Sequence, residues 1–126
     1  MTSKKYSESL EDYLEAICLK GGEHVKSVEL ARHLKVSRAS VNKAINTLID
    51  KKLVEKKYYG DISLTEEGKN ISMKILWKHR LLKRFLINIL GVSEEDASYE
   101  ACGIEHSVSD DTAEKLERLI ERLEKE

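Results

Sequence analysis

Three side chains near the C-terminal end of the chain could bind one metal ion together. Cys102, Glu105 and His106 stand at offsets of 0, +3 and +4, which fall on one face of a helix. Thiolate, carboxylate and imidazole groups all bind transition metals, and three such donors on one face can supply half of a coordination sphere. The spacing therefore indicates a metal site whose other ligands must come from elsewhere in the chain.

Other metal-binding side chains are less informative by themselves. Asp12 and Glu15 form a carboxylate pair at a spacing of three residues, on the helix face away from Leu14 and Cys18. His79 stands midway along a second, longer helical segment. A carboxylate pair or a single histidine on a helix is usually solvated surface, so these residues become candidates only in combination with the first cluster.

The composition is typical of a soluble, helix-rich protein with one domain or two small ones. The chain has 126 residues, of which 36% are charged and 6% aromatic, and it has no proline. No apolar run approaches the ~20 residues that a membrane span needs, and the N-terminus lacks the apolar segment of a signal peptide. The two cysteines, Cys18 and Cys102, make no disulfide framework. We therefore expect a cytoplasmic protein without a membrane partner.

The net charge of −1 conceals a strong segregation of charge along the chain. Residues 26–58 contain nine Lys or Arg and three Asp or Glu, which gives +6. Residues 93–126 contain four basic and twelve acidic residues, which gives −8. Such a division indicates different partners for the two parts, although solvated helix faces would explain the charge equally well.

The N-terminal half predicts three helices followed by a hairpin. Apolar spacing predicts helices over residues 7–20, over 28–34 with Ser27 as its cap, and over 38–52 with Ser37 as its cap. Residues 53–56 and 62–64 resemble short strands, with a turn at 58–61. Helix, helix, short turn, helix and two-stranded hairpin is the order of a winged helix-turn-helix.

The C-terminal half predicts further helices. A long helix runs from residue 65 to about residue 90, where Gly91 ends it. Ser93 begins a helix that carries the 102–106 cluster, and Ser109 caps a last amphipathic helix. The predicted fold is therefore mainly α, with a winged helix-turn-helix domain at 1–65 followed by an α-helical domain at 66–126.

The third helix and the hairpin turn are the candidate DNA-binding elements. Small polar residues at the start of a recognition helix let the backbone approach the major groove, and lysines in a wing meet phosphates. The candidates are Ser37, Arg38, Ala39, Ser40, Asn42 and Lys43 in the helix, and Lys56, Lys57, Tyr58 and Tyr59 in the hairpin. The alternative is a winged-helix module that contacts only proteins.

Several separated motifs, taken together, resemble the diphtheria toxin repressor and manganese transport regulator family of metal-dependent transcriptional repressors. The resemblance spans residues 6 to about 120. The motifs, in order, are Glu11-Asp12-Tyr13-Leu14, Leu64-Thr65-x-x-Gly68, Lys78-His79-Arg80-Leu81, Leu90-Gly91-Val92, Glu100-Ala101-Cys102-x-x-Glu105-His106 and Ser109-Asp110.

This resemblance implies a homodimer that binds double-stranded operator DNA, with residues 66–126 as the metal-binding and dimerisation domain. It implies a metal site between the first helix and the dimerisation helices, with Asp12, Glu15, His79, Cys102, Glu105 and His106 as ligands. The additional C-terminal domain of longer family members is expected to be absent, because the chain stops at the last helix.

The ligand set mixes two family patterns. The manganese branch usually has Glu at the position of Cys102, whereas the iron branch has Cys there but Met at the position of Asp12. Mixed donors favour Fe²⁺ or Mn²⁺ in the cell, while a thiolate also lets Co²⁺ and Zn²⁺ bind in vitro. We therefore expect a metal-responsive repressor that controls metal homeostasis, and neither an enzyme nor a binder of small organic substrates.

Three alternatives stay open at the level of sequence. A winged-helix regulator could sense an organic ligand or an oxidant through Cys102, although nearby carboxylates raise a thiol pKa and so oppose oxidant sensing. A metallohydrolase could use the same ligands, but the sequence offers no glycine-rich loop and no further catalytic group. A structural interaction module would bind no metal.

Overall fold

The computed structural model describes residues 7–126, and at Tyr58 it describes the backbone but not the side chain. The described chain divides into two compact units, residues 7–73 and Lys74–Glu126. The division falls inside one long helix, and the predicted domain boundary at residue 65 stays a prediction. None of the helices described for residues 7–126 combines the length and apolar character needed to cross a membrane.

The first unit begins with three helices, α1 (Glu8–Leu19), α2 (Ser27–Leu34) and α3 (Arg38–Asp50). Ser37 caps α3 as predicted, because its hydroxyl accepts a hydrogen bond from the Ser40 N–H at 3.0 Å. The predicted cap of α2 is wrong by one residue. Lys26 occupies the cap position, because the Glu29 carboxylate accepts the Lys26 N–H at 3.0 Å and draws Ser27 into the first turn.

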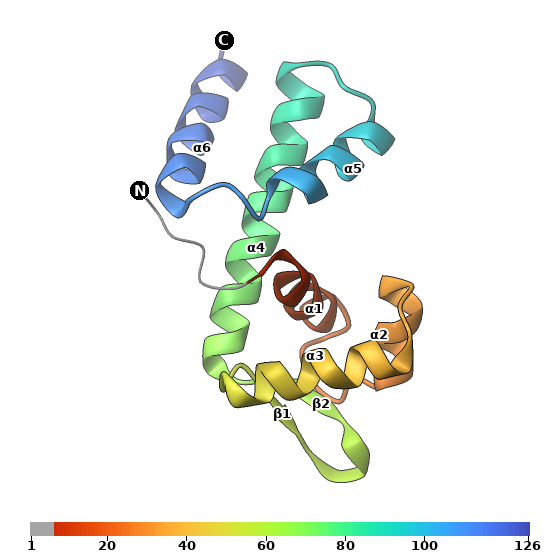
Figure 1. Ribbon diagram of the computed structural model, residues 1–126. Helices are drawn as coiled ribbons and strands as arrows, with labels where there is room; N and C mark the ends of the chain where they lie inside the picture. Colours follow the sequence, from red (N-terminus) through yellow and green to blue (C-terminus); the bar gives the residue numbers. More distant parts are fainter. Residues whose placement is uncertain (1–6) are drawn as a thin grey trace. The chain divides into compact units, whose positions relative to one another are not determined.

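A hairpin follows these helices. Strands β1 (Val54–Lys56) and β2 (Ile62–Leu64) pair antiparallel, with Val54 opposite Leu64. A short 3₁₀ turn, η1 (Tyr58–Gly60), joins them, and both Tyr59 and Gly60 have positive φ there. In Figure 1 the hairpin projects beyond α3, with its turn farthest from α1. The wing predicted from the sequence is therefore present.

A close backbone approach fixes the exit from this hairpin. The Thr65 hydroxyl donates to the Lys52 carbonyl at 2.8 Å and accepts from the Gly68 N–H at 3.1 Å, which starts the next helix. A Cβ at Gly68 would lie 2.1 Å from the Leu53 carbonyl oxygen, so only glycine fits this contact. The core beneath is formed mainly by α1, α3 and the strands, with Leu14, Ile17, Val41, Ile45, Leu48, Leu53 and Ile62 fully buried.

The second unit contains most of α4 (Glu66–Arg84), the turn η2 (Phe85–Ile89), α5 (Glu94–Ile104) and α6 (Asp110–Glu124). The prediction of one α-helix to about residue 90 is wrong over its last turn. That turn is π-helical, because the Leu90 N–H bonds to the Phe85 carbonyl five residues back. Gly91, with φ of 75°, ends it as predicted.

Ser93 and Ser109 cap the next two helices, as predicted from the sequence. Their hydroxyls accept the N–H groups of Asp96 at 3.2 Å and Thr112 at 3.1 Å. Figure 1 shows α6 beside the later turns of α4. Two apolar clusters hold this unit together, and Val108 and Leu116 pack against both. The fold is mainly α, as predicted.

Candidate metal centre and nucleic-acid interface

The end of α5 positions two of the predicted ligands differently from the sequence prediction. The helix ends at Ile104, so Glu105 and His106 lie in the following turn rather than on the helix. The Ser107 N–H closes this turn on the Ile104 carbonyl at 2.9 Å. Glu105 nevertheless keeps helical dihedral angles, φ −54° and ψ −32°, so its +3 offset from Cys102 survives.

The structure brings three of the predicted ligands together within the second unit. Nδ1 of His79, on α4, lies 2.6 Å from Oε1 of Glu105 and 3.7 Å from Sγ of Cys102. Nitrogen, sulfur and oxygen donors of the three residues all lie within 4.8 Å of one another. One imidazole, one thiol and one carboxylate at such separations can be bridged by a single metal ion.

Glu105 and His106 are both buried, at 1% and 7% exposure. Nε2 of His106 lies 3.6 Å from the second carboxylate oxygen of Glu105, Oε2. That oxygen is buried and accepts no hydrogen bond from any residue described in the structure. Because a buried carboxylate oxygen without a donor is costly, the residues present fit a cation at this position.

Asp12 and Glu15, the other predicted ligands, lie in the first unit. They stand three residues apart on α1, and both are half-buried. Their role as ligands stays a prediction from the resemblance.

The candidate DNA-binding residues of α3 lie on its solvent side. Val41, Ile45 and Leu48 bury the opposite face of this helix in the core. The six candidates at the start of α3, its cap included, are all exposed, namely Ser37, Arg38, Ala39, Ser40, Asn42 and Lys43. The helix therefore presents a mainly polar surface at its positive, N-terminal end. Contact with DNA by these side chains stays a prediction.

The wing residues are also on the surface. Lys56 and Lys57 are exposed, and Tyr59 is 98% exposed at the turn. Tyr59 has a φ of 61°, a left-handed conformation that non-glycine residues adopt infrequently. The predicted contact by the Tyr58 side chain lies outside the described residues.

An ion pair at the base of the wing was not anticipated from the sequence. Asp61 pairs with Lys26, and its other oxygen lies 3.5 Å from Nδ1 of His24. The hydrogen bond from Lys26, with a smaller contribution from its charge, holds the pKa of Asp61 below its usual range. These contacts connect the wing to the start of α2, beside the backbone bridge between Val25 and Ile62.

A second unanticipated contact set lies near the metal-site candidates. Lys78 and Lys74 both pair with Asp110, at 2.9 Å each, and connect α4 to the start of α6. One indication of this contact is present in the sequence, because Lys78 and Asp110 both belong to motifs that carry the family resemblance. Their mutual contact spans 32 positions and could not be predicted from local spacing.

Comparison with known proteins agrees with this geometry. Residues 5–62 match the N-terminal DNA binding domain of the iron dependent repressor family, and residues 65–126 match its metal binding and dimerisation domain. An uncharacterized HTH-type transcriptional regulator of Methanocaldococcus jannaschii is 38% identical over 120 residues, covering 93% of this chain and 96% of that protein. The chain belongs to the iron-dependent repressor family. Its winged-helix unit is accordingly the family's DNA-binding domain.

Further relatives of this family member include a regulator named MntR and solved manganese regulators. HTH-type transcriptional regulator MntR of Geobacillus thermodenitrificans is 33% identical over 123 residues, covering 94% of this chain and 84% of that protein. The solved manganese regulator SloR has a TM-score of 0.79 at 29% identity, covering 96% of this chain and 55% of SloR. ScaR with bound Zn²⁺ has a TM-score of 0.78 at 31% identity, covering 89% and 53%. The chain thus spans about half the length of these solved regulators.

Proposed function

We propose that this chain is a metal-activated repressor, which binds operator DNA as a homodimer and controls metal-ion homeostasis. The observation that carries the proposal is the grouping of His79, Cys102 and Glu105 within 4.8 Å. These residues lie in the part of the chain that matches the family's metal binding and dimerisation domain. An interaction module without a ligand would have no use for such a donor cluster.

The donors support a divalent transition metal. The sulfur of Cys102 favours softer ions, whereas the carboxylate of Glu105 suits harder ones. We propose Fe²⁺ or Mn²⁺ as the cellular ion, and expect Co²⁺ and Zn²⁺ to bind in vitro. His106, next to Glu105, is a further ligand in this proposal, and Asp12 and Glu15 complete the set by the resemblance.

A bound cation supplies the positive charge that the clustered acidic donors lack. Without it, Asp12, Glu15, Glu105 and an ionised Cys102 repel one another, so the segments that carry them resist coming together. When this repulsion is removed, the two recognition helices of a dimer take up one fixed separation. Because a symmetric dimer must match two half-sites, a fixed separation favours operator binding.

DNA binding rests on the exposed N-terminal half of α3 and on the wing. Arg38, Asn42 and Lys43 can donate to base edges or phosphates, and Lys56 and Lys57 to phosphates. A coupling of ~1–3 kcal/mol between the metal and the DNA would raise affinity about 5–150-fold.

The test needs a DNA probe and two metals. A duplex is selected from a random pool with the protein and Mn²⁺, and its affinity is measured anaerobically with Mn²⁺, with Fe²⁺ and with chelator. The wild type is compared with the double variant Cys102→Ala/His106→Ala. We expect tight binding only with metal and only by the wild type. Equal affinity for the duplex with metal and with chelator would contradict the sensor mechanism. A change in DNA affinity on addition of peroxide without metal would favour oxidant sensing through Cys102.

A further inference from the structure

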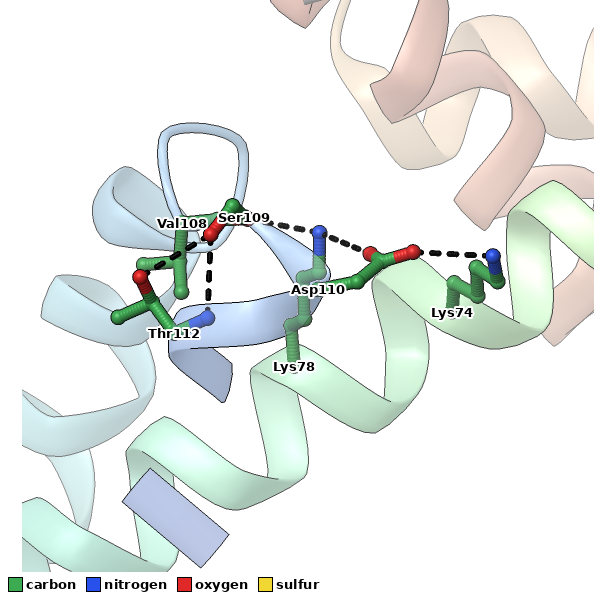
Figure 2. Close-up of polar contacts among 6 residues, drawn as sticks. All are labelled: Lys74, Lys78, Val108, Ser109, Asp110 and Thr112. Carbon is green, nitrogen blue, oxygen red and sulfur yellow. Dashed lines mark hydrogen bonds and ion pairs between the residues drawn. The ribbon is translucent and has the colours of Figure 1, made fainter. Parts of the chain in front are cut away.

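Lys78 is the most buried partner in a contact set next to the donor cluster. Its side chain is 14% exposed, and its Nζ donates to the Val108 carbonyl oxygen at 2.7 Å. The same Nζ pairs with Oδ1 of Asp110 at 2.9 Å, as Figure 2 shows. Lys78 therefore connects α4 to two points at the junction between the ligand-bearing turn and α6.

A second lysine reinforces this connection. Lys74 lies one helical turn before Lys78 on α4, and its Nζ pairs with Oδ2 of Asp110 at 2.9 Å. Hydrogen bonds from Lys78 and then Lys74 hold the pKa of Asp110 below its usual range. Ser109, just before it, caps α6 through Thr112 (Figure 2). The start of α6 is therefore anchored to α4 by both oxygens of one carboxylate.

The anchored segment also carries two donors. Glu105 and His106 stand three and two residues before Val108, and His79 directly follows Lys78. Since each residue spans at most about 3.6 Å of chain, a fixed Val108 limits how far Glu105 can move from α4. The bond from Lys78 to Val108 thus limits the separation between the helix that holds His79 and the turn that holds Glu105.

We propose that Lys78 is a positioning residue for the metal site, which holds the turn of Glu105 and His106 against His79 before metal binds. This inference rests on the proposed function, because it assigns a role in metal binding. Lys78 acts through Val108 and Asp110 rather than as a ligand. It lies one step further out than a group that bonds to a ligand directly, because it holds the chain that carries the ligands.

Electrostatics alone predicts the opposite outcome, which makes the inference testable. A lysine cation close to a divalent ion repels it, so removal of the Lys78 charge would by itself tighten metal binding. Loss of the anchor would instead weaken metal binding, because the free turn must be ordered when the ion binds. The sign of the change in affinity separates these two roles.

The experiment compares Lys78→Met, which keeps most of the length of the side chain, with Lys78→Arg, which keeps its charge and its N–H donors. Lys115→Met is the matched control, because Lys115 pairs with Asp111 at 2.9 Å within α6 and is 67% exposed. Affinities for Mn²⁺ and Co²⁺ are measured by calorimetry under anaerobic conditions, and the absorption spectrum of bound Co²⁺ reports ligand geometry. Far-UV circular dichroism at the same temperature shows that each variant is folded.

We expect Lys78→Met to weaken binding of both ions by up to about 10-fold, the lower end of the effect of a group bonded to a ligand, and to change the Co²⁺ spectrum. Lys78→Arg should restore most of the affinity, and Lys115→Met should match the wild type. Unchanged or tighter binding by a folded Lys78→Met would overturn the inference and leave the proposed function standing. Wild-type protein that binds neither ion would overturn both.

A second variant keeps the test decisive if Lys78→Met does not fold. Asp110→Asn removes one charge from the anchor but leaves the bond from Lys78 to the Val108 carbonyl. We expect a smaller loss of affinity for both ions than in Lys78→Met, with a Co²⁺ spectrum closer to that of the wild type. Metal affinities of Asp110→Asn that equal those of the wild type would then count against the inference.

Discussion

Glu105 offers one carboxylate oxygen to each of two histidines. Its Oε1 lies 2.6 Å from Nδ1 of His79, and its Oε2 lies 3.6 Å from Nε2 of His106. The residue is 1% exposed, so both contacts are shielded from water. Glu105 is therefore the centre of the donor cluster, and its replacement should affect metal binding more than that of a neighbouring glutamate.

Replacement of Glu105 by Gln should abolish the stabilisation that metal confers. An ion at 100 times its dissociation constant stabilises a folded protein by about 2.7 kcal/mol, which raises the melting temperature. We expect this increase with Mn²⁺ or Co²⁺ in the wild type and in Glu100→Gln, an exposed position on α5. Glu105→Gln should show little increase. A variant that gains as much as the wild type would remove Glu105 from the ligand set.

Arg38→Ala and Lys43→Ala should weaken binding to the selected duplex. Loss of a base or phosphate contact by a recognition helix costs about 1–3 kcal/mol, which corresponds to a 5- to 150-fold loss of affinity. Lys20→Ala is the matched control, because Lys20 is an exposed lysine at the end of α1. Fluorescence anisotropy measures all three. If both α3 variants bind like the control, the recognition surface assigned to α3 is wrong.

Gly68→Ala should destabilise the protein. The new Cβ would lie 2.1 Å from the Leu53 carbonyl oxygen, a backbone atom that cannot move alone. Overpacking of this kind costs about 1–3 kcal/mol in the free energy of unfolding. Gly103→Ala is the control, because a Cβ there meets no atom within 4 Å, and alanine within a helix should stabilise by about 0.5–1 kcal/mol. In urea unfolding of the metal-free protein, the midpoint should be lower for Gly68→Ala and higher for Gly103→Ala than for the wild type.

Glu124 should contribute to the acid sensitivity of the fold. Hydrogen bonds from Arg84 and then Asn88 lower the pKa of Glu124 from 4.5 to about 2. Because the pKa is lower in the folded state, the contribution is present above pH 4.5 and is lost as the pH falls towards 2. Glu124→Gln should therefore lose less stability than the wild type between pH 5 and pH 2.

Thermal melting across this pH range measures the difference. Glu114→Gln, at an exposed position of the same helix, should behave like the wild type. Parallel curves for Glu124→Gln and the wild type would show that the contact with Arg84 contributes nothing to the pH dependence.

Local chemistry made much of the fold predictable. Ser37, Ser93 and Ser109 are predictable caps because serine is favoured just before the first turn of a helix, and each hydroxyl does accept an N–H three residues later. The serine preference alone misplaces the cap of α2, because the Glu29 carboxylate accepts the Lys26 N–H and moves the start of the helix by one residue.

Long-range contacts explain what the sequence did not predict. The three-residue offset predicted that Cys102 and Glu105 share a side of the chain, but the end of α5 at Ile104 follows from the buried turn beyond it. The contact of Lys78 with Val108 joins residues 30 positions apart, and helix or strand periodicity predicts contacts only between residues a few positions apart. The ligand roles of Asp12, Glu15 and the other candidates stay predictions.

The ion pair at the base of the wing changes how the basic segment should be counted. Lys26 contributes to the +6 of residues 26–58, yet its charge is matched by Asp61. Binding of a lysine to a DNA phosphate releases counterions. Each such contact adds about 0.9 to the magnitude of the slope of log affinity against log salt concentration. A lysine already paired within the protein releases none. The salt dependence of operator binding should therefore reflect fewer cations than the sequence contains, and Lys26→Gln should leave its slope unchanged.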